Sequence, residues 1–222
     1  ERRLIDRAEL VLFSSATLAE RVCGRASVRR FEIVNNGVAD SWLAGEPAAP
    51  RAPTVTSEGL VLGYFGTISH WFDWPLVLRL LEALPGAHLE VAGPIEAPLP
   101  SHPRVRHVGM LRHVDLASFA ARCDVLVMPF IVNRLIQSVD PVKLYEYVAL
   151  GRPAIAPRYA ESERFAPWVG LYRDFDEALT LLRRPQAPTQ GALRRAFLAA
   201  NTWSLRMRQI DHSLALLAGT TA

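Results

Sequence analysis

Short apolar runs alternate with longer segments of helical periodicity along most of the chain. The apolar runs predict strands at 10–13, 31–34, 60–65, 88–92, 105–108, 125–128, 154–156 and 169–172. Between them, apolar residues recur every three or four positions and predict helices at 1–8, 15–22, 73–84, 115–121, 141–150, 175–182, 191–200 and 203–218. Apolar strands that alternate with helices are typical of a parallel, doubly wound α/β sheet, which is the fold class that we expect.

The turns that follow the predicted strands point to one binding region. In doubly wound sheets, ligands bind beyond the carboxyl ends of the strands. The segments at those ends are Gly66-Thr67, Gly93-Pro94, Gly109-Met110 and residues 129–143. We therefore expect these four segments to converge on a single cleft.

The predicted helix at 141–150 carries the strongest candidate chemistry. Asp140 suits the N-cap, Pro141 suits the first helical position, and Gly151 suits the left-handed residue that ends a helix. Lys143 and Glu146 are three residues apart and therefore neighbours on the helix surface. Free amides at a helix N-terminus, together with a lysine, favour the binding of an anion. A glutamate one turn later can accept hydrogen bonds from two hydroxyls.

Lys143 is the only lysine among the 25 Lys and Arg residues of the chain. An arginine is a broad planar fork, whereas a lysine is a compact charge on a thin stem, so a narrow phosphate pocket can require lysine. The alternative is an ordinary surface lysine that pairs with Glu146. The solitary lysine favours the functional interpretation.

Composition narrows the class of protein. The net charge of +3 is small and the arginines are scattered, so we expect no nucleic-acid partner. The two cysteines, Cys23 and Cys123, have neither metal nor redox spacing, which favours a reducing cytoplasm. No apolar run approaches the roughly 20 residues of a membrane-spanning helix.

Several short motifs, in this order and spacing, resemble a known family. The motifs are Val91-Ala92-Gly93-Pro94, Val108-Gly109, Cys123-Asp124-Val125, Pro129-Phe130 and Lys143-Leu144-Tyr145-Glu146-Tyr147. Together they resemble the C-terminal, donor-binding domain of glycosyltransferases of the GT-B fold, most of all glycosyltransferase family 4, which has a Rossmann-like sheet. Trp71-Phe72-Asp73 and Asn133 make the chain similar to bacterial cell-surface polysaccharide transferases, including the teichuronic-acid type.

This resemblance implies a division of the chain. Residues 1–45 resemble the end of the N-terminal (acceptor) domain, and residues 59–202 resemble the donor nucleotide-sugar-binding domain. Residues 46–58 contain Pro47, Pro50 and Pro53 and are predicted to be a linker. Residues 203–222 resemble a C-terminal helix that crosses back toward the N-terminal domain. Since a complete enzyme needs both halves, we expect the isolated chain to bind a donor weakly and to be inactive.

The resemblance also implies roles for individual residues. The glutamate that matches Glu146 takes the two ribose hydroxyls of a nucleotide-sugar, and the lysine that matches Lys143 holds the diphosphate. Further donor-binding positions are the amides from Pro141 and Val142 onward, the close-approach pair Gly66 and Thr67, and the base-facing backbone of Gly109, Met110 and Leu111. Such enzymes generally work without a catalytic metal, so we expect neither a metal nor another cofactor.

The chain departs from the family pattern in two places. Many members carry a glutamate against the sugar eight residues before the ribose-binding one, where this chain has Ser138. Asp140 is a substitute for it, although its role as an N-cap is the stronger interpretation. Members also often carry an arginine and a lysine after the first donor-domain strand, where this chain offers only His70 as a phosphate contact. No catalytic residue is assigned from the sequence.

The resemblance implies a retaining, hexosyltransferase-type enzyme of bacterial cell-surface polysaccharide synthesis. Its partners are a nucleotide-sugar donor and a glycan or lipid-linked acceptor. We expect it in the cytoplasm, with peripheral association at the inner face of the membrane through a preceding domain. The alternatives are a sugar-nucleotide epimerase of the same fold, which needs further acid and base groups in the cleft, and a catalytically inactive domain that binds a nucleotide or a partner protein.

Overall fold

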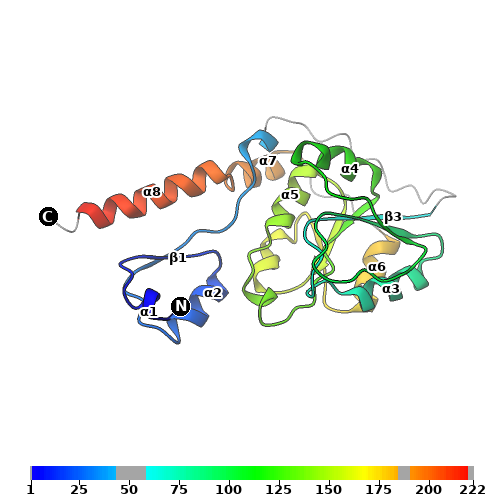
Figure 1. Ribbon diagram of the computed structural model, residues 1–222. Helices are drawn as coiled ribbons and strands as arrows, with labels where there is room; N and C mark the ends of the chain where they lie inside the picture. The colour runs from blue at the N-terminus through cyan, green and yellow to red at the C-terminus, as the bar shows by residue number, and fades with distance from the viewer. Residues whose placement is uncertain (1, 44–58, 185–190, 220–222) are drawn as a thin grey trace.

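The computed structural model describes residues 2–43, 59–184 and 191–219, which form a small and a large sheet (Figure 1). The predicted linker at 46–58 lies outside these residues. In the described part, the small sheet and the long C-terminal helix lie on one side of the molecule, and the large sheet with its helices lies on the other (Figure 1).

The large sheet has six parallel strands in the order β5-β4-β3-β6-β7-β8. Their bounds are Val61–Phe65 (β3), His88–Ala92 (β4), Val105–His107 (β5), Val125–Val127 (β6), Ala154–Pro157 (β7) and Gly170–Tyr172 (β8). Because the chain moves outward from β3 to β5 and then returns to add β6 on the other side of β3, the order reverses at the middle of the sheet. A ligand crevice is expected at this reversal, beyond the carboxyl ends of the strands.

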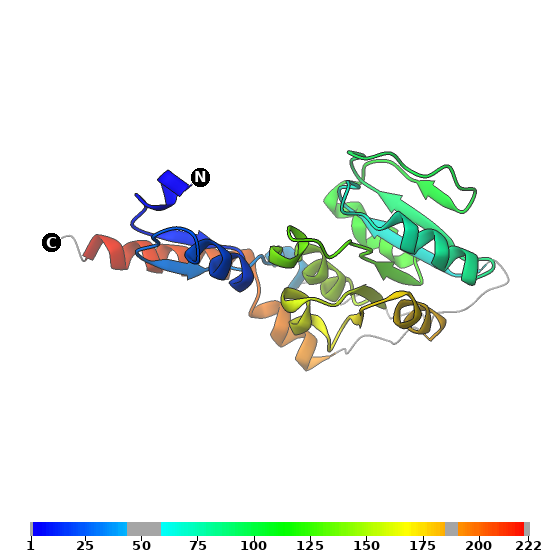
Figure 2. The same cartoon turned by 90° about the horizontal axis from the view of Figure 1, so that it is seen from below.

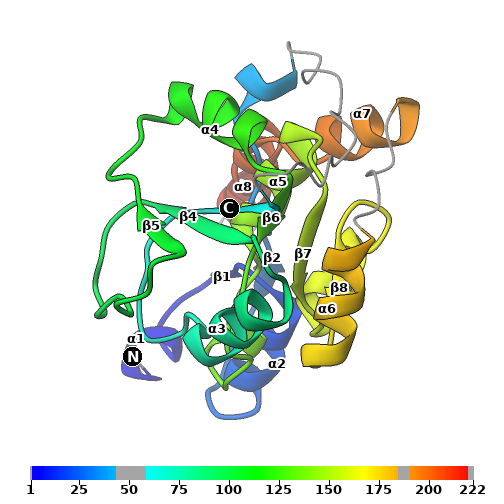
Figure 3. The same ribbon diagram turned by 90° about the vertical axis from the view of Figure 1, so that its right-hand side faces the viewer.

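Helices cover both faces of the large sheet, so the predicted doubly wound fold is confirmed. Figure 3 shows α3 (Trp74–Ala83) and α6 (Phe175–Arg183) on one face. The other face carries α4 (Leu116–Arg122), α5 (Val142–Leu150) and α7 (Ala192–Ala199) (Figure 3). The Asp73 side chain accepts a hydrogen bond from the Leu76 amide at 2.9 Å and caps α3, which begins within one residue of the start of the predicted helix at 73–84.

The small sheet consists of two parallel strands, β1 (Val11–Phe13) and β2 (Phe31–Ile33), joined by α2 (Ala16–Cys23) and preceded by α1 (Arg2–Ile5). The C-terminal helix α8 (Trp203–Gly219) runs along this sheet (Figure 2). The Gln209 side chain fixes the contact, because its Nε2 donates to Glu32 Oε1 at 2.6 Å and to the Ile33 carbonyl at 3.0 Å. No helix among the described residues has the length and apolar character needed to cross a membrane.

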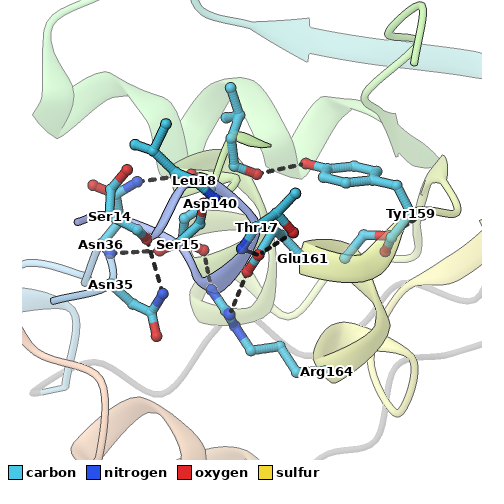
Figure 4. A network of polar contacts seen from close by, with 12 residues as sticks. Ser14, Ser15, Thr17, Leu18, Asn35, Asn36, Asp140, Tyr159, Glu161 and Arg164 are labelled. Carbon is cyan, nitrogen blue, oxygen red and sulfur yellow. Dashed lines mark hydrogen bonds and ion pairs between the residues drawn. The ribbon is translucent and has the colours of Figure 1, made fainter. Parts of the chain in front are cut away.

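A buried polar network joins the small sheet to the start of α5 (Figure 4). The Asp140 carboxylate accepts hydrogen bonds from the Asn36 amide and the Tyr145 hydroxyl, and it pairs with Arg164. The Asn36 side chain in turn donates to the Asp140 carbonyl at 2.7 Å. The prediction that Asp140 caps α5 is therefore wrong, because these partners occupy its carboxylate. Pro141, predicted as the first helical residue, takes the N-cap position without a side-chain cap.

A second carboxylate extends the network to α2. Glu161, in the short η4 helix (Ala160–Phe165), accepts from the backbone N and the Oγ1 of Thr17 at 2.9 and 2.8 Å. Arg164 Nη1 lies 3.6 Å from Glu161 Oε2, so its guanidinium bridges both carboxylates (Figure 4). Burial lowers the pKa of Arg164 to about 10, with a smaller contribution from Arg206.

Replacing Arg164 by Met should lower the free energy of unfolding by about 3 kcal/mol, because it leaves the Asp140 carboxylate buried without its cation. The Asp140 side chain has 0% exposure, so water cannot replace the lost partner. Urea denaturation of the variant and the wild type measures the difference.

Arg158→Met is the matched control, because it breaks the pair with Glu163, whose side chain is 50% exposed. This substitution should lower the free energy of unfolding by less than about 1 kcal/mol. Adding Asp140→Asn to Arg164→Met should recover part of the lost stability by removing the stranded charge. Equal losses in Arg164→Met and Arg158→Met would contradict this account of the network.

Candidate functional site

A cleft of about 320 Å³ opens where the order of the large sheet reverses. Its walls are the turns after β3 and β4, the segment after β5 and the first two turns of α5. Seven of the nine predicted donor-binding residues line it together: Gly66, Thr67, Met110, Leu111, Val142, Lys143 and Glu146. The structure therefore brings most of the predicted donor-binding residues into one place.

The Lys143 side chain lies against Gly66 and near the aromatic rings of Tyr64 and Phe130. Gly66 has φ +127°, and a Cβ built at this position would collide with the Cε of Lys143. The Lys143 ammonium lies 5.7 Å from the ring centroid of Tyr64 and 6.0 Å from that of Phe130, within range of cation–π attraction. Burial lowers the pKa of Lys143, and the negative charge of Glu146 opposes this shift. The absence of a side chain at Gly66 is what gives the lysine its position.

The turns after β3 and β4 form one wall of the cleft by direct backbone contact. The Gly66 amide donates to the Ala92 carbonyl at 2.8 Å, and the Gly93 amide donates to the Gly109 carbonyl at 2.9 Å. Gly93 has φ +124°, and a Cβ there would collide with the Gly66 carbonyl oxygen. Gly109 thus adjoins the cleft through its carbonyl, and glycines permit the close approach of the turns.

The amino end of α5 faces the cleft without a capping side chain. Pro141 is the N-cap residue and makes no side-chain hydrogen bond to the helix. The Leu144 amide bonds to the Pro141 carbonyl at 2.9 Å, whereas Val142 and Lys143 line the cleft. Because the first amides of a helix have no intrahelical acceptor, this end attracts an anion. The helix ends as predicted, at Gly151 with φ +62°.

Glu146 lies one turn further along α5, with 21% of its side chain exposed. Burial raises its pKa, and the positive charge of Lys143 is the main influence that opposes the shift. His113 Nε2 lies 4.0 Å from Glu146 Oε1 and also lines the cleft. Sequence reasoning missed His113. The only signal was its place four residues after Gly109, in a segment expected to reach the cleft.

Three residues considered for sugar or phosphate contacts lie outside the cleft lining within the described part of the chain. His70 is exposed and its ring packs against Trp71, with centroids 4.9 Å apart. Ser138, in η3 (Ile136–Ser138), accepts a hydrogen bond from Arg21 at 2.6 Å. Asp140 belongs to the buried network described above. Their proposed contacts to a donor stay predictions.

The cleft thus places a group suited to phosphate and a group suited to hydroxyls three residues apart on α5, at Lys143 and Glu146. A lysine ammonium and free helix amides suit a phosphate, while a carboxylate beside them suits a pair of hydroxyls. A nucleoside diphosphate carries both groups, with the ribose hydroxyls a few bonds from the phosphates. The cleft therefore has the chemistry of a nucleotide site.

Comparison with solved structures identifies the fold as that of GT-B glycosyltransferases, and so confirms the fold that the resemblance in the sequence implied. Sucrose-phosphate synthase from Thermosynechococcus elongatus matches with a TM-score of 0.71 and 16% identity, over 99% of this chain and 61% of that chain. The apo form of the lipopolysaccharide outer core galactosyltransferase WaaB matches with a TM-score of 0.64 and 15% identity, over 93% of this chain and 62% of that chain.

Among curated proteins, the chain is similar to TuaH of Bacillus subtilis (strain 168), whose name provisionally assigns it to glycosyl transfer in teichuronic acid biosynthesis. The two are 24% identical over 228 residues, which cover 95% of this chain and 57% of TuaH. No family model matches the chain. The chain spans about three fifths of the length of the proteins it matches.

Replacing Lys143 by Met should make the protein more stable, by about 1 kcal/mol. Burial lowers the pKa of Lys143 and outweighs the attraction of Glu146, so the charged form opposes folding. This cost is largest below the lowered pKa, and it disappears only as the pH rises past the ordinary value of 10.5, so it is present at pH 7. Thermal unfolding at pH 7 should show a melting temperature higher by ~2–4 °C.

Arg173→Met serves as the control, because that side chain is 65% exposed and pairs with Glu177 four residues later. Its melting temperature should move by less than about 1 °C. A Lys143→Met variant that melts several degrees below the wild type would contradict the claim that the charged Lys143 side chain lowers the stability of the protein.

Proposed function

We propose that this chain is the donor-binding half of a glycosyltransferase that moves a hexosyl group from a nucleotide-sugar to a glycan or lipid-linked acceptor. The observation that carries the proposal is the position of Lys143 and Glu146 in one cleft at the uncapped end of α5. The GT-B fold supports the same class of reaction.

In this proposal the diphosphate lies between the amino end of α5 and the turn after β3. Lys143 and the amides of Val142 and Lys143 bind its oxygens, and Gly66 leaves room for it. During transfer the bond between the sugar's anomeric carbon and the diphosphate breaks, so negative charge grows on the leaving group. A fixed ammonium and a helix amino end stabilise that charge more than they stabilise the intact donor.

The nucleoside lies on the other side of Lys143 in this proposal. Glu146 accepts hydrogen bonds from the ribose hydroxyls, for which its carboxylate must be ionised. Lys143 helps here, because its charge opposes the rise in the pKa of Glu146 that burial causes. The base lies along Gly109, Met110 and Leu111, where the Met110 side chain is 70% exposed and available to a ligand.

The rest of the reaction depends on groups that we assign to the preceding domain. An acceptor hydroxyl oxygen bonds to the anomeric carbon and loses its proton, while the nucleoside diphosphate departs. Retention of configuration and the absence of a metal or cofactor rest on the family resemblance. The names of TuaH and WaaB favour a surface glycan as product. Membrane association at the cytoplasmic face stays a prediction.

Calorimetric titration of the chain with UDP and GDP tests the donor site. At least one of the two should bind to the wild type, and both Lys143→Met and Glu146→Gln should weaken that binding at least about tenfold, because each removes a charge-assisted contact. Glu163→Gln and Arg173→Met are matched controls on exposed residues and should bind as the wild type does.

Two outcomes would count against this function. If neither UDP nor GDP binds to the wild type, as this chain or as protein that includes the preceding domain, the cleft is not a nucleoside diphosphate site. If the wild type binds but Lys143→Met and Glu146→Gln bind equally well, the ligand lies elsewhere. Transfer of radiolabelled sugar from UDP- or GDP-hexoses, assayed on protein that includes the preceding domain, then separates an enzyme from a domain that only binds.

A further inference from the structure

His113, which lies beside Glu146, is held by the side chain of Trp42, a residue outside the large sheet. His113 belongs to η2 (His113–Asp115) at the rim of the cleft. Trp42, in η1 (Asp40–Leu43), donates its indole N–H to His113 Nε2 at 3.1 Å. The two rings meet edge to face with centroids 5.1 Å apart and an angle of 76° between their planes. The contact joins positions 71 residues apart in the chain.

The short helix that carries Trp42 is tied to the start of α8. Val38 forms a parallel bridge with Thr202, and the Ser204 hydroxyl donates to Asp40 Oδ2 at 2.7 Å. The Trp42 side chain also packs against the large core. The indole is thus held by anchors that precede it in the chain and by its own packing on the core, with its N–H directed at the imidazole.

The hydrogen bond sets the state of the imidazole. A ring nitrogen that accepts a hydrogen bond carries no proton, so neutral His113 has its proton on Nδ1 and none on Nε2. Nε2 is also the atom that lies 4.0 Å from Glu146 Oε1. While Trp42 occupies Nε2, the imidazole therefore does not donate to the glutamate. Without the indole N–H, the neutral ring can carry its proton on Nε2 instead of Nδ1 and donate it to the carboxylate.

We propose that Trp42 is a positioning residue for the donor site. It prevents His113 from donating a hydrogen bond to Glu146, and so leaves the Glu146 carboxylate available to the ribose hydroxyls. This inference rests on the proposed function of Glu146. It also makes the segment at 40–43, which lies outside the large sheet, part of the machinery that recognises the nucleoside.

The test is Trp42→Phe, which removes the indole N–H and keeps an aromatic ring. With whichever of UDP and GDP binds the wild type more tightly, calorimetry should show affinity reduced about tenfold, because His113 then competes for Glu146. The 2′,3′-dideoxy form of the same nucleotide should bind Trp42→Phe and the wild type equally, since it offers Glu146 no hydroxyl. Adding His113→Phe to Trp42→Phe should restore affinity for the ribonucleotide.

Trp74→Phe is the matched control, because the Trp74 indole N–H is buried without a hydrogen-bond partner among the described residues. It should leave affinity unchanged. A Trp42→Phe variant that binds as the wild type does, loses equal affinity for the dideoxy form, or is not rescued by His113→Phe would overturn the inference. The proposed function is judged separately, because Lys143→Met and Glu146→Gln must weaken binding whatever Trp42 does.

Discussion

A single half-buried ammonium group, that of Lys143, constrains the architecture of the cleft. Its side chain fits only because Gly66 has no Cβ, and Gly66 adopts its backbone conformation only because the turns after β3 and β4 pack backbone against backbone. The rings of Tyr64 and Phe130 lie within cation–π range of the charge. An arginine fork is wider and could not occupy this space in the same way. The one lysine of the chain therefore stands where a compact cation is needed.

The start of α5, the helix that carries Lys143, is tied to the small sheet through Asp140 and Asn36. The Asp140 carboxylate accepts hydrogen bonds from Asn36 and Tyr145 and pairs with Arg164. It therefore does not cap the amino end of α5. A capping side chain at this place would satisfy the amides that a ligand needs. The polar network thus holds the two parts of the molecule together and at the same time leaves the helix end available. Stability and binding are coupled through one aspartate.

Much of the fold follows from local patterns. Each predicted strand of the large sheet forms within a residue or two of its expected bounds, because apolar runs between turn residues act over short distances. The end of α5 at Gly151 and the start of the helix predicted at 73–84 are also set locally, and both are confirmed. The convergence of Gly66, Lys143 and Glu146 followed from the rule that ligands bind at the carboxyl ends of parallel strands.

What the sequence did not predict depends on partners far away in the chain. Asp140 looked like a cap because local sequence cannot reveal Asn36, 104 positions earlier. The pairing of Trp42 with His113 likewise has no local signature.

The most direct test of the account is a crystal structure of the chain with bound UDP or GDP. The account predicts diphosphate oxygens within hydrogen-bond distance of the Lys143 ammonium and the first amides of α5, and ribose hydroxyls on Glu146. A nucleotide bound elsewhere, or bound in this cleft with its ribose turned away from Glu146, would contradict it.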